Sequence, residues 1–197
     1  TCLAWASSDG SQSAAIIVTT YFGAGSTATI RNNTLSGNLN GILVGYDAND
    51  SSSVTVTHND LSDIDNRALH VTSASVSVAA EQNWFGSDTG PANAANPGGT
   101  GSAVFGNVDF SPWLGDGTDT DTETLGFQPN LTPVYYLPVG IGFSTEPTGA
   151  LLGAALGTQP ALTVTNEIGE IATQFNGEVT LEIGNNAGEP VKGELRG

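Results

Sequence analysis

Cationic side chains are scarce in this sequence. Four lysine and arginine residues stand against 20 aspartate and glutamate residues, which gives a formal net charge of −16 at pH 7. A chain of this charge has no basic surface to neutralise phosphates, so we expect it to bind neither nucleic acid nor an anionic membrane surface. No apolar run is long enough to span a bilayer, so we predict no membrane insertion.

Sulfur-containing residues are almost absent: the chain has one cysteine, Cys2, and no methionine. A single cysteine cannot form a disulfide within the chain. Cys2 falls at an inward position of the repeat set out below, so we interpret it as a small buried core residue, with a reactive thiol or an intermolecular bridge as alternatives. The chain has neither an initiator methionine nor a signal peptide and begins inside a repeat, so we interpret it as a piece of a longer protein.

Patterns typical of helices and of common catalytic sites are missing as well. No window holds a sustained apolar stripe of period 3.6, whereas abundant Gly, Ser, Thr, Asn and Asp favour turns and short strands. The sequence has no Gly-x-Ser-x-Gly nucleophile elbow, no zinc-ligand spacing and no glycine-rich phosphate loop that leads into a helix. We therefore predict an all-β chain for which Ca²⁺ is the one candidate cofactor.

What the sequence does contain is an internal repeat marked by three asparagines. Asn33, Asn59 and Asn83 are spaced by 26 and 24 residues, and a pair of apolar residues lies five and three positions before each. A period of this length, built of short alternating strands, is typical of a solenoid of stacked coils. We expect the three asparagine side chains to form a hydrogen-bonded ladder along the axis. Alternation predicts that Ile42 points inward and that Leu43 points outward.

The repeat is followed by a segment rich in aromatic residues. It contains Asn83-Trp84-Phe85-Gly86-Ser87, then Gly90-Pro91, then residues 106–114 (GNVDFSPWL). Residues 26–114 thereby resemble the closing part of bacterial secreted right-handed parallel β-helix proteins of the pectate-lyase-like fold, although Phe85 replaces a tryptophan of their pattern. The resemblance implies C-terminal β-helix coils and a cap over residues 1–114. We expect the open end of the coils to be plugged by the following side chains: Trp84, Phe85, Val104, Phe105, Phe110 and Trp113.

Composition changes after residue 114. Residues 115–138 are acidic and then proline-bearing, which predicts an interdomain linker. Residues 139–197 alternate again, with strands expected over 141–145, 161–165 and 178–183. Their pattern resembles the first strands of invasin-like and filamin-like Ig domains. Because a complete sandwich needs about 100 residues, we predict an incomplete Ig-like β-sandwich.

The candidate catalytic residues follow from the resemblance, because β-helix lyases and esterases act through carboxylates and a cationic side chain on an outer face. The candidates are Arg31, His58, Asp63, Asp65 and Arg67, with Asp60 and His70 nearby. No two carboxylates stack at one column of successive coils, so a solvated polar surface is the alternative interpretation.

Calcium could be bound by an acidic run made of Asp116, Asp119, Asp121 and Glu123, since Ca²⁺ prefers oxygen ligands. The run lacks the glycine and the distal glutamate of the twelve-residue calcium loop, so a plain acidic linker is the alternative. A second candidate group consists of Asp47, Asn49 and Asp50. Three sequons for N-glycosylation are present, at Asn32, Asn49 and Asn130.

Together these features predict a structural or adhesive segment of a large extracellular or cell-surface bacterial protein. The first alternative is a polysaccharide lyase or carbohydrate esterase module that acts on or binds acidic glycans, although Tyr46 is the only aromatic residue among residues 26–82. The second is a fibre subunit that self-associates by strand donation, through the incomplete Ig-like sheet or the open N-terminal coil.

Overall fold

The fold is known from a computed structural model that describes residues 14–20, 25–149 and 154–182. Cys2 lies outside these residues. The described residues form strands, turns and loops but no helix, so the all-β prediction is confirmed. None of them belongs to a helix with the length and apolar character to cross a membrane.

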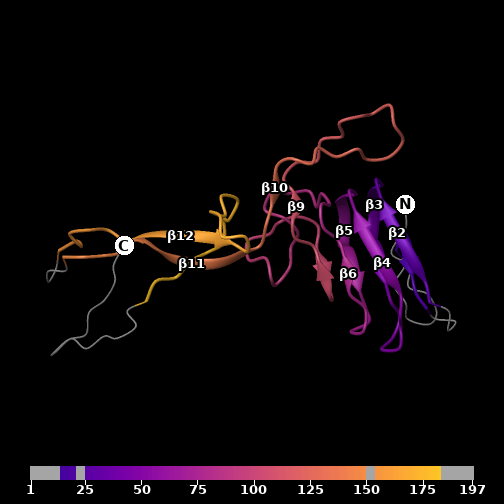
Figure 1. Cartoon of the computed structure of the whole chain (residues 1–197), viewed down its shortest axis with the longest axis horizontal. Helices are drawn as coiled ribbons and strands as arrows, with labels where there is room; N and C mark the ends of the chain where they lie inside the picture. Colours follow the sequence, from indigo (N-terminus) through magenta and orange to yellow (C-terminus); the bar gives the residue numbers. More distant parts are fainter. Residues whose placement is uncertain (1–13, 21–24, 150–153, 183–197) are drawn as a thin grey trace.

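The N-terminal part is a parallel β-solenoid of about three turns, visible as the stacked arrows in Figure 1. It has two four-stranded parallel sheets, with strand orders β1-β3-β5-β7 and β2-β4-β6-β8. The first sheet consists of β1 (Ile16–Val18), β3 (Thr34–Val44), β5 (Asp60–Val71) and β7 (Val104–Phe105). The second consists of β2 (Thr27–Arg31), β4 (Ser53–Thr57), β6 (Val78–Ala79) and β8 (Val108–Asp109).

The pairing of β1 with β3 and of β2 with β4 has the register that the repeat predicts, whereas the pairing of β3 with β5 shifts by one residue at bulges. Ile16 pairs with Ile42 in the first sheet, and Ile30 pairs with Val56 in the second. Like residues therefore stack on like residues, and their side chains fill the space between the sheets. The largest aliphatic side chains of this core, all with 0 % exposure, are Ile42, Val44, Val56, Leu61, Leu69 and Val78.

The asparagine ladder is present and spans three coils. Asn59 and Asn83 are completely buried. The Nδ2 of Asn33 donates to Oδ1 of Asn59, and the Nδ2 of Asn59 donates to Oδ1 of Asn83, each at 3.0 Å. The residue before each ladder asparagine, namely Asn32, His58 or Gln82, has a φ of 55° to 58°. This left-handed conformation makes the sharp turn that aims each amide into the core.

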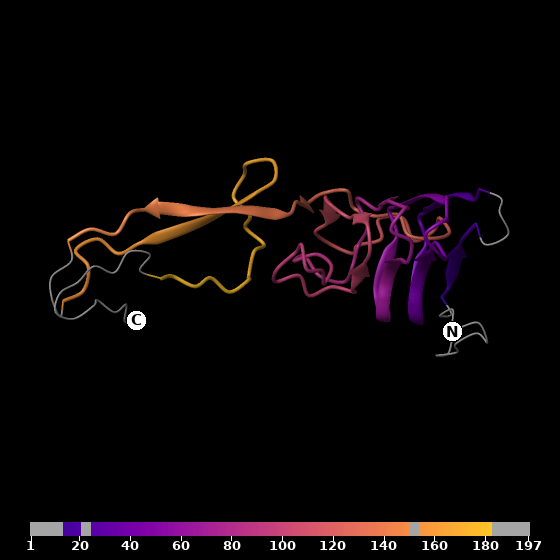
Figure 2. The same ribbon diagram turned by 90° about the horizontal axis from the view of Figure 1, so that it is seen from below.

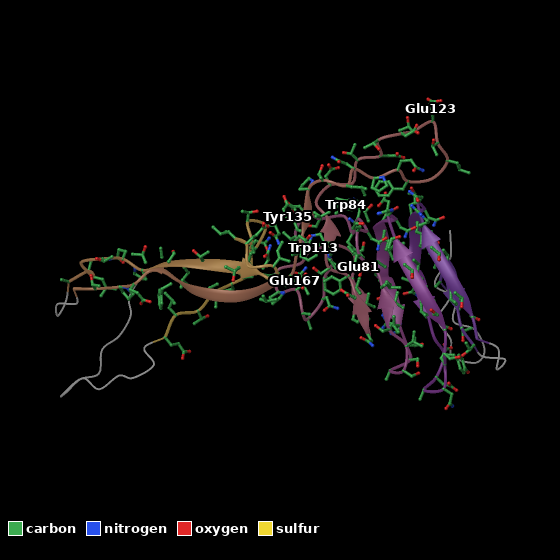
Figure 3. The ribbon with its side chains drawn as sticks, viewed as in Figure 1. Glu81, Trp84, Trp113, Glu123, Tyr135 and Glu167 are labelled. Carbon is green, nitrogen blue, oxygen red and sulfur yellow. The ribbon has the colours of Figure 1, made fainter. Side chains whose placement is uncertain are left out.

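An aromatic cap closes the C-terminal end of the solenoid. Phe85, Phe110 and Trp113 are buried, and the Trp113 Nε1 donates to the carbonyl of Asp88 at 2.9 Å. Figure 3 shows Trp84 and Trp113 near Tyr135 in this region. Strand β9 (Trp113–Leu114) pairs antiparallel with β10 (Val134–Tyr135), which ends the parallel stacking.

Two residues depart from the predicted plug: Trp84 is half-buried beside Gly117 and lies outside the core cluster, and Phe105 points away from the core. The side chain of Phe105 is 44 % exposed, whereas the neighbouring Val104 is 1 % exposed. Successive residues of a strand point to opposite faces, so Val104 takes the inward position and Phe105 points to solvent. The prediction that Trp84 and Phe105 belong to the plug was wrong.

Residues 115–138 fold back against the solenoid. Phe127 is 2 % exposed, its N–H donates to the Asn32 carbonyl at 2.9 Å, and the Nδ2 of Asn32 donates to the Phe127 carbonyl at 2.8 Å. This pair of hydrogen bonds attaches the acidic loop to the first complete coil, across 95 residues of sequence. Glu123 lies at the tip of the loop in Figure 3.

The C-terminal part is an antiparallel two-stranded ribbon of β11 (Pro138–Thr145) and β12 (Ala161–Asn166). It leads away from the cap on the side opposite to the first coils (Figure 2). The strands expected over 141–145 and 161–165 are confirmed, but residues 178–182 form no strand. Small antiparallel sheets are the only sheets in the described residues after 114.

Candidate functional site

Two of the predicted site residues lie at the corner between β2 and β3 and the equivalent corner one coil later. Arg31 ends β2 and His58 follows β4 directly. The Nε of Arg31 donates to Oδ1 of Asn32 at 2.9 Å, and Nε2 of His58 lies 3.1 Å from Oε1 of Gln82. The structure therefore places Arg31 and His58 at neighbouring corners, as the column alignment predicts, and each has a hydrogen-bond partner within the turn stack.

The other three predicted residues lie on β5, in the other sheet. Asp63 accepts a hydrogen bond from the N–H of Gly37 at 2.9 Å, so its carboxylate ties β5 to β3. Asp65 is exposed in the middle of the strand, and Arg67 lies further toward its end. From Asp60, where β5 begins, Arg67 is roughly 20 Å along the strand. Arg31 and His58 therefore lie at the corners of two coils, and Asp63, Asp65 and Arg67 lie along β5 in the other sheet.

Arg67 instead belongs to a cluster with His70 and Phe105. Its Nη1 donates to Nδ1 of His70 at 3.2 Å, and its Cζ lies 5.1 Å from the ring centroid of Phe105. The rings of His70 and Phe105 meet edge to face, with centroids 6.1 Å apart. Burial and then the charge of Arg67 lower the pKa of His70, so the imidazole is neutral at physiological pH. We call this group the outer-face cluster.

The outer-face cluster continues a column of side chains across four coils. Strand pairing places Ile17 beside Leu43, Leu43 beside His70, and His70 beside Phe105. Leu43 points outward, as predicted, yet it is only 8 % exposed because its neighbours in the column cover it. The outer surface of this sheet therefore carries a partly apolar stripe with a cation at one end.

A groove of about 350 Å³ lies next to this cluster, between β5 and residues 100–103. Its lining is mostly polar and consists of Ser62, Ile64, Asp65, Asn66, Phe85, Gly86, Thr100, Gly101, Ser102 and Ala103. Sequence reasoning missed this groove because residues 86–103 follow no repeat. The groove brings together Asp65 and hydroxyl groups that lie more than 30 residues later.

The candidate calcium ligands are engaged by their own turns. Asp116 accepts from the N–H of Thr118, and Asp119 accepts from the N–H of Asp121. The side-chain hydrogen bond from Thr118 lowers the pKa of Asp116, and that from Thr124 lowers the pKa of Asp121. No group of three or more His, Cys, Asp or Glu suited to a metal ion occurs in residues 14–20, 25–149 and 154–182. Calcium binding stays a prediction.

Asp50 of the second calcium group is a buried structural carboxylate. It is 4 % exposed and accepts hydrogen bonds from the Thr19 hydroxyl, the Thr20 N–H and the Ser52 N–H, at 2.8 to 2.9 Å. Burial opposes ionisation, but these donors outweigh it and hold the pKa of Asp50 well below its usual range. The other acidic residue of that group, Asp47, accepts from the N–H of Asn49.

Comparison with known proteins adds no name to this geometry. No protein-family model matches the chain. No curated protein and no solved structure matches it either.

Proposed function

We propose that this chain is a structural or adhesive segment of an extracellular or cell-surface bacterial protein. In this proposal, residues 1–114 are the last coils and cap of a right-handed β-helix of the pectate-lyase-like kind. The observation that carries the proposal is the elongated arrangement in which a capped solenoid continues into a slender ribbon (Figures 1 and 2). A stalk needs such a shape together with a junction that resists bending.

The junction between the cap and the β11–β12 ribbon is held by hydrogen bonds. Ser111 in the cap donates its hydroxyl to the carboxylate of Glu167 and accepts from the N–H of Leu137 at 3.2 Å. The N–H of Glu167 donates to the Leu137 carbonyl at 2.9 Å. The Nε2 of Gln174 donates to the Tyr136 carbonyl at 3.1 Å. The two bonds of Ser111 join the cap to the base of the ribbon, and the other two tie together the segments that form this base.

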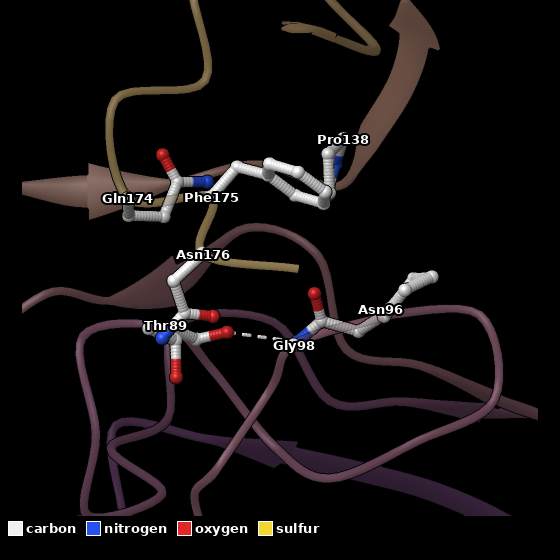
Figure 4. Close-up of a pocket in the computed structure, with 8 residues that line it drawn as sticks. Thr89, Asn96, Gly98, Pro138, Gln174, Phe175 and Asn176 are labelled. Atoms are coloured by element: carbon white, nitrogen blue, oxygen red, sulfur yellow. Dashed lines mark hydrogen bonds between the residues drawn. The ribbon is translucent and has the colours of Figure 1, made fainter. Parts of the chain in front are cut away.

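The loops beside the junction pack closely. Figure 4 shows Asn96 and Gly98 of the cap facing Gln174, Phe175 and Asn176. A Cβ on Gly98 would lie 2.6 Å from Oδ1 of Asn176, so only glycine permits this approach. The pocket between these loops has a volume of only about 10 Å³.

We further infer that the ribbon is the start of an Ig-like sandwich. One face of β11 carries Val139, Ile141 and Phe143, which are 45 % to 65 % exposed. Ile141 and Phe143 pair with Val164 and Leu162 of β12, so the apolar side chains share one face. A second sheet packed on this face would bury them, as in a sandwich.

The same apolar face favours self-assembly as a second candidate function. A ribbon with an exposed apolar face can accept a strand from another copy at the outer edge of β11, because residues 170–172 already pair with part of the outer edge of β12. Light scattering over a range of concentrations distinguishes the stalk from self-assembly. The stalk proposal predicts a constant molar mass, whereas strand donation predicts a molar mass that rises with protein concentration.

The stalk proposal is tested by distance measurements across the junction. Spin labels at exposed positions on β4 and β11, in a Cys2→Ser background, should give one narrow distance distribution. The paired variant Ser111→Ala should broaden it, because it removes both bonds of the Ser111 hydroxyl. A broad distribution in the parent protein would contradict a stiff junction.

A lyase or esterase makes a different prediction. Charged polysaccharides, with and without Ca²⁺, should yield unsaturated uronates or methanol if the module is an enzyme. We expect no turnover. Calcium-dependent turnover that Arg67→Ala abolishes would replace the stalk proposal with a catalytic one.

A further inference from the structure

We propose that the groove beside β5, together with Phe105, binds neutral sugar units of an uncharged polysaccharide. Nothing in the stalk proposal requires this site, and the site does not require a stiff junction.

The groove exists because two stacked strands differ in length. β5 has 12 residues, whereas the strand stacked on it, β7, has two. Before β7 begins, residues 86–103 leave the coil and return along the open part of β5. Hydrogen bonds fix the returning chain: the N–H of Ser102 donates to the Phe85 carbonyl at 2.7 Å, and the N–H of Ala68 donates to the Ala103 carbonyl at 2.8 Å.

Two glycines let the walls of the groove approach each other closely. A Cβ on Gly101 would lie 2.6 Å from the Phe85 carbonyl oxygen, and a Cβ on Gly86 would lie 3.1 Å from the Cβ of Ser62. Gly86 also has a φ of +91°, which other residues rarely adopt. A volume of about 350 Å³ lies at the lower end of the range of roughly 300–1,000 Å³ for small-ligand sites.

Thr100 and Ser102, which line the groove, have their hydroxyls held in place before any ligand arrives. The hydroxyls of Ser87, Thr89 and Thr100 form a closed triangle with sides of 2.8 to 2.9 Å. The Ser102 hydroxyl donates to the Ser62 carbonyl at 3.0 Å. Groups that are already ordered lose little conformational entropy on binding, which favours affinity for a polyhydroxylated ligand.

Asp65 and Asn66 supply the strongest acceptors. The exposed Asp65 carboxylate makes no hydrogen bond to any residue that the structure describes, so its two oxygens can accept from adjacent sugar hydroxyls. The Nδ2 of Asn66 donates to Oδ1 of Asn40 at 2.9 Å, which orients the amide and leaves its oxygen available to a ligand. Hydrogen bonds to a carboxylate are stronger than those between neutral groups.

Phe105 extends the site by a second sugar unit. It lies two residues after Ala103, roughly 7 Å along the strand from the edge of the groove. Its ring is 44 % exposed, and Arg67 and His70 hold it in position. A flat aromatic surface suits the C–H face of a pyranose ring, so the groove and Phe105 together match about two linked hexoses.

Charge decides between neutral and acidic sugars. The net charge of −16 repels a polyanion, and Asp65 places a carboxylate inside the groove. Binding of uronate chains is therefore disfavoured. The hydroxyls of a neutral polysaccharide can form the same hydrogen bonds without repulsion between like charges.

The test is a titration of the isotope-labelled protein, followed by amide NMR shifts, with cellotetraose, xylotetraose and mannotetraose as neutral probes and tetragalacturonate as the acidic probe. We expect millimolar binding of at least one neutral probe, with shifts confined to residues 62–67 and 100–105. Asp65→Asn and Phe105→Ala should each weaken that binding about tenfold, the equivalent of one charge-assisted hydrogen bond or one stacking contact.

Asp63→Asn is the matched control. It makes the same change of charge on the same strand, but residue 63 is directed at Gly37 of the neighbouring coil. The affinity of Asp63→Asn for the neutral probes should equal that of the parent protein. Three results would overturn the proposal: no shifts with any neutral probe, equal weakening by Asp63→Asn and Asp65→Asn, or tighter binding of tetragalacturonate than of the neutral probes. The amide spectrum itself shows whether each variant is folded.

Discussion

Replacing Asn59 with alanine removes the central rung of the asparagine ladder. The side chain of Asn59 has five hydrogen-bond contacts of 2.9 to 3.0 Å: its Oδ1 accepts from the N–H and the Nδ2 of Asn33, and the two hydrogens of its Nδ2 are shared among Ile30 O, Thr57 O and Asn83 Oδ1. All five are lost in Asn59→Ala. Because residue 59 is completely buried, water cannot replace them.

The expected loss follows from which groups remain without partners. The Asn33 N–H and the Ile30 carbonyl each lose their bond to residue 59, and an unsatisfied buried group costs about 1–3 kcal/mol. A small cavity adds to this cost, so the free energy of unfolding should fall by about 3–5 kcal/mol. Asn33→Ala, at the half-buried first position of the ladder, is the matched control and should cost about 1 kcal/mol.

Urea unfolding, followed by tryptophan fluorescence and by circular dichroism, measures both losses. Asn59→Asp adds a second test, because it places a carboxylate oxygen where an amide donates to two carbonyls. Burial and those carbonyls should raise the pKa of the new carboxyl, so the penalty should be largest at neutral pH and should shrink as pH falls. Equal losses for Asn59→Ala and Asn33→Ala would refute the reasoning, since burial would then not matter.

Three further predictions concern the cap, the buried carboxylate and the outer-face cluster. Gly90→Ala should cost at least about 2 kcal/mol in urea unfolding, because the new Cβ would lie 2.5 Å from the Trp113 ring at a φ of +79°. The pKa of Asp50 is lower in the folded protein than in the unfolded chain, so its stabilisation is present above about pH 4 and is lost as pH falls. The urea midpoints of Asp50→Asn at pH 7 and pH 3 should therefore differ by less than those of the parent protein. Arg67→Gln should raise the pKa of His70 in an NMR titration, because it removes a neighbouring positive charge while burial remains.

The solenoid could be predicted from sequence because every coil repeats the same physical requirement. Each ladder position needs an amide, and each inward position needs an apolar side chain, so the spacing of Asn33, Asn59 and Asn83 also fixes the pairing of Ile30 with Val56. The alignment failed where β5 bulges. There Asp63 pairs with Ser36, one residue away from the Gly37 that a constant period predicts.

The groove could not be predicted, because it depends on a segment without a period. Residues 86–103 carry no repeat, and their return along β5 is determined by tertiary hydrogen bonds. One signal was nevertheless available for Phe105. Two consecutive strand residues cannot both face inward, and the repeat assigns the inward position to Val104, which pairs with Leu69. That alternation places Phe105 on the outer face, within reach of Arg67.

The change from parallel to antiparallel pairing at β9 also changes how much length the chain gains per residue. A coil of 24 to 26 residues advances the solenoid by one strand spacing, about 4.8 Å, whereas the eight residues of β11 span roughly 26 Å. The molecule is therefore thick on the solenoid side of the cap and thin on the side of the β11–β12 ribbon. Resistance to bending grows steeply with thickness, so a sideways load should deform the ribbon long before it deforms the coils.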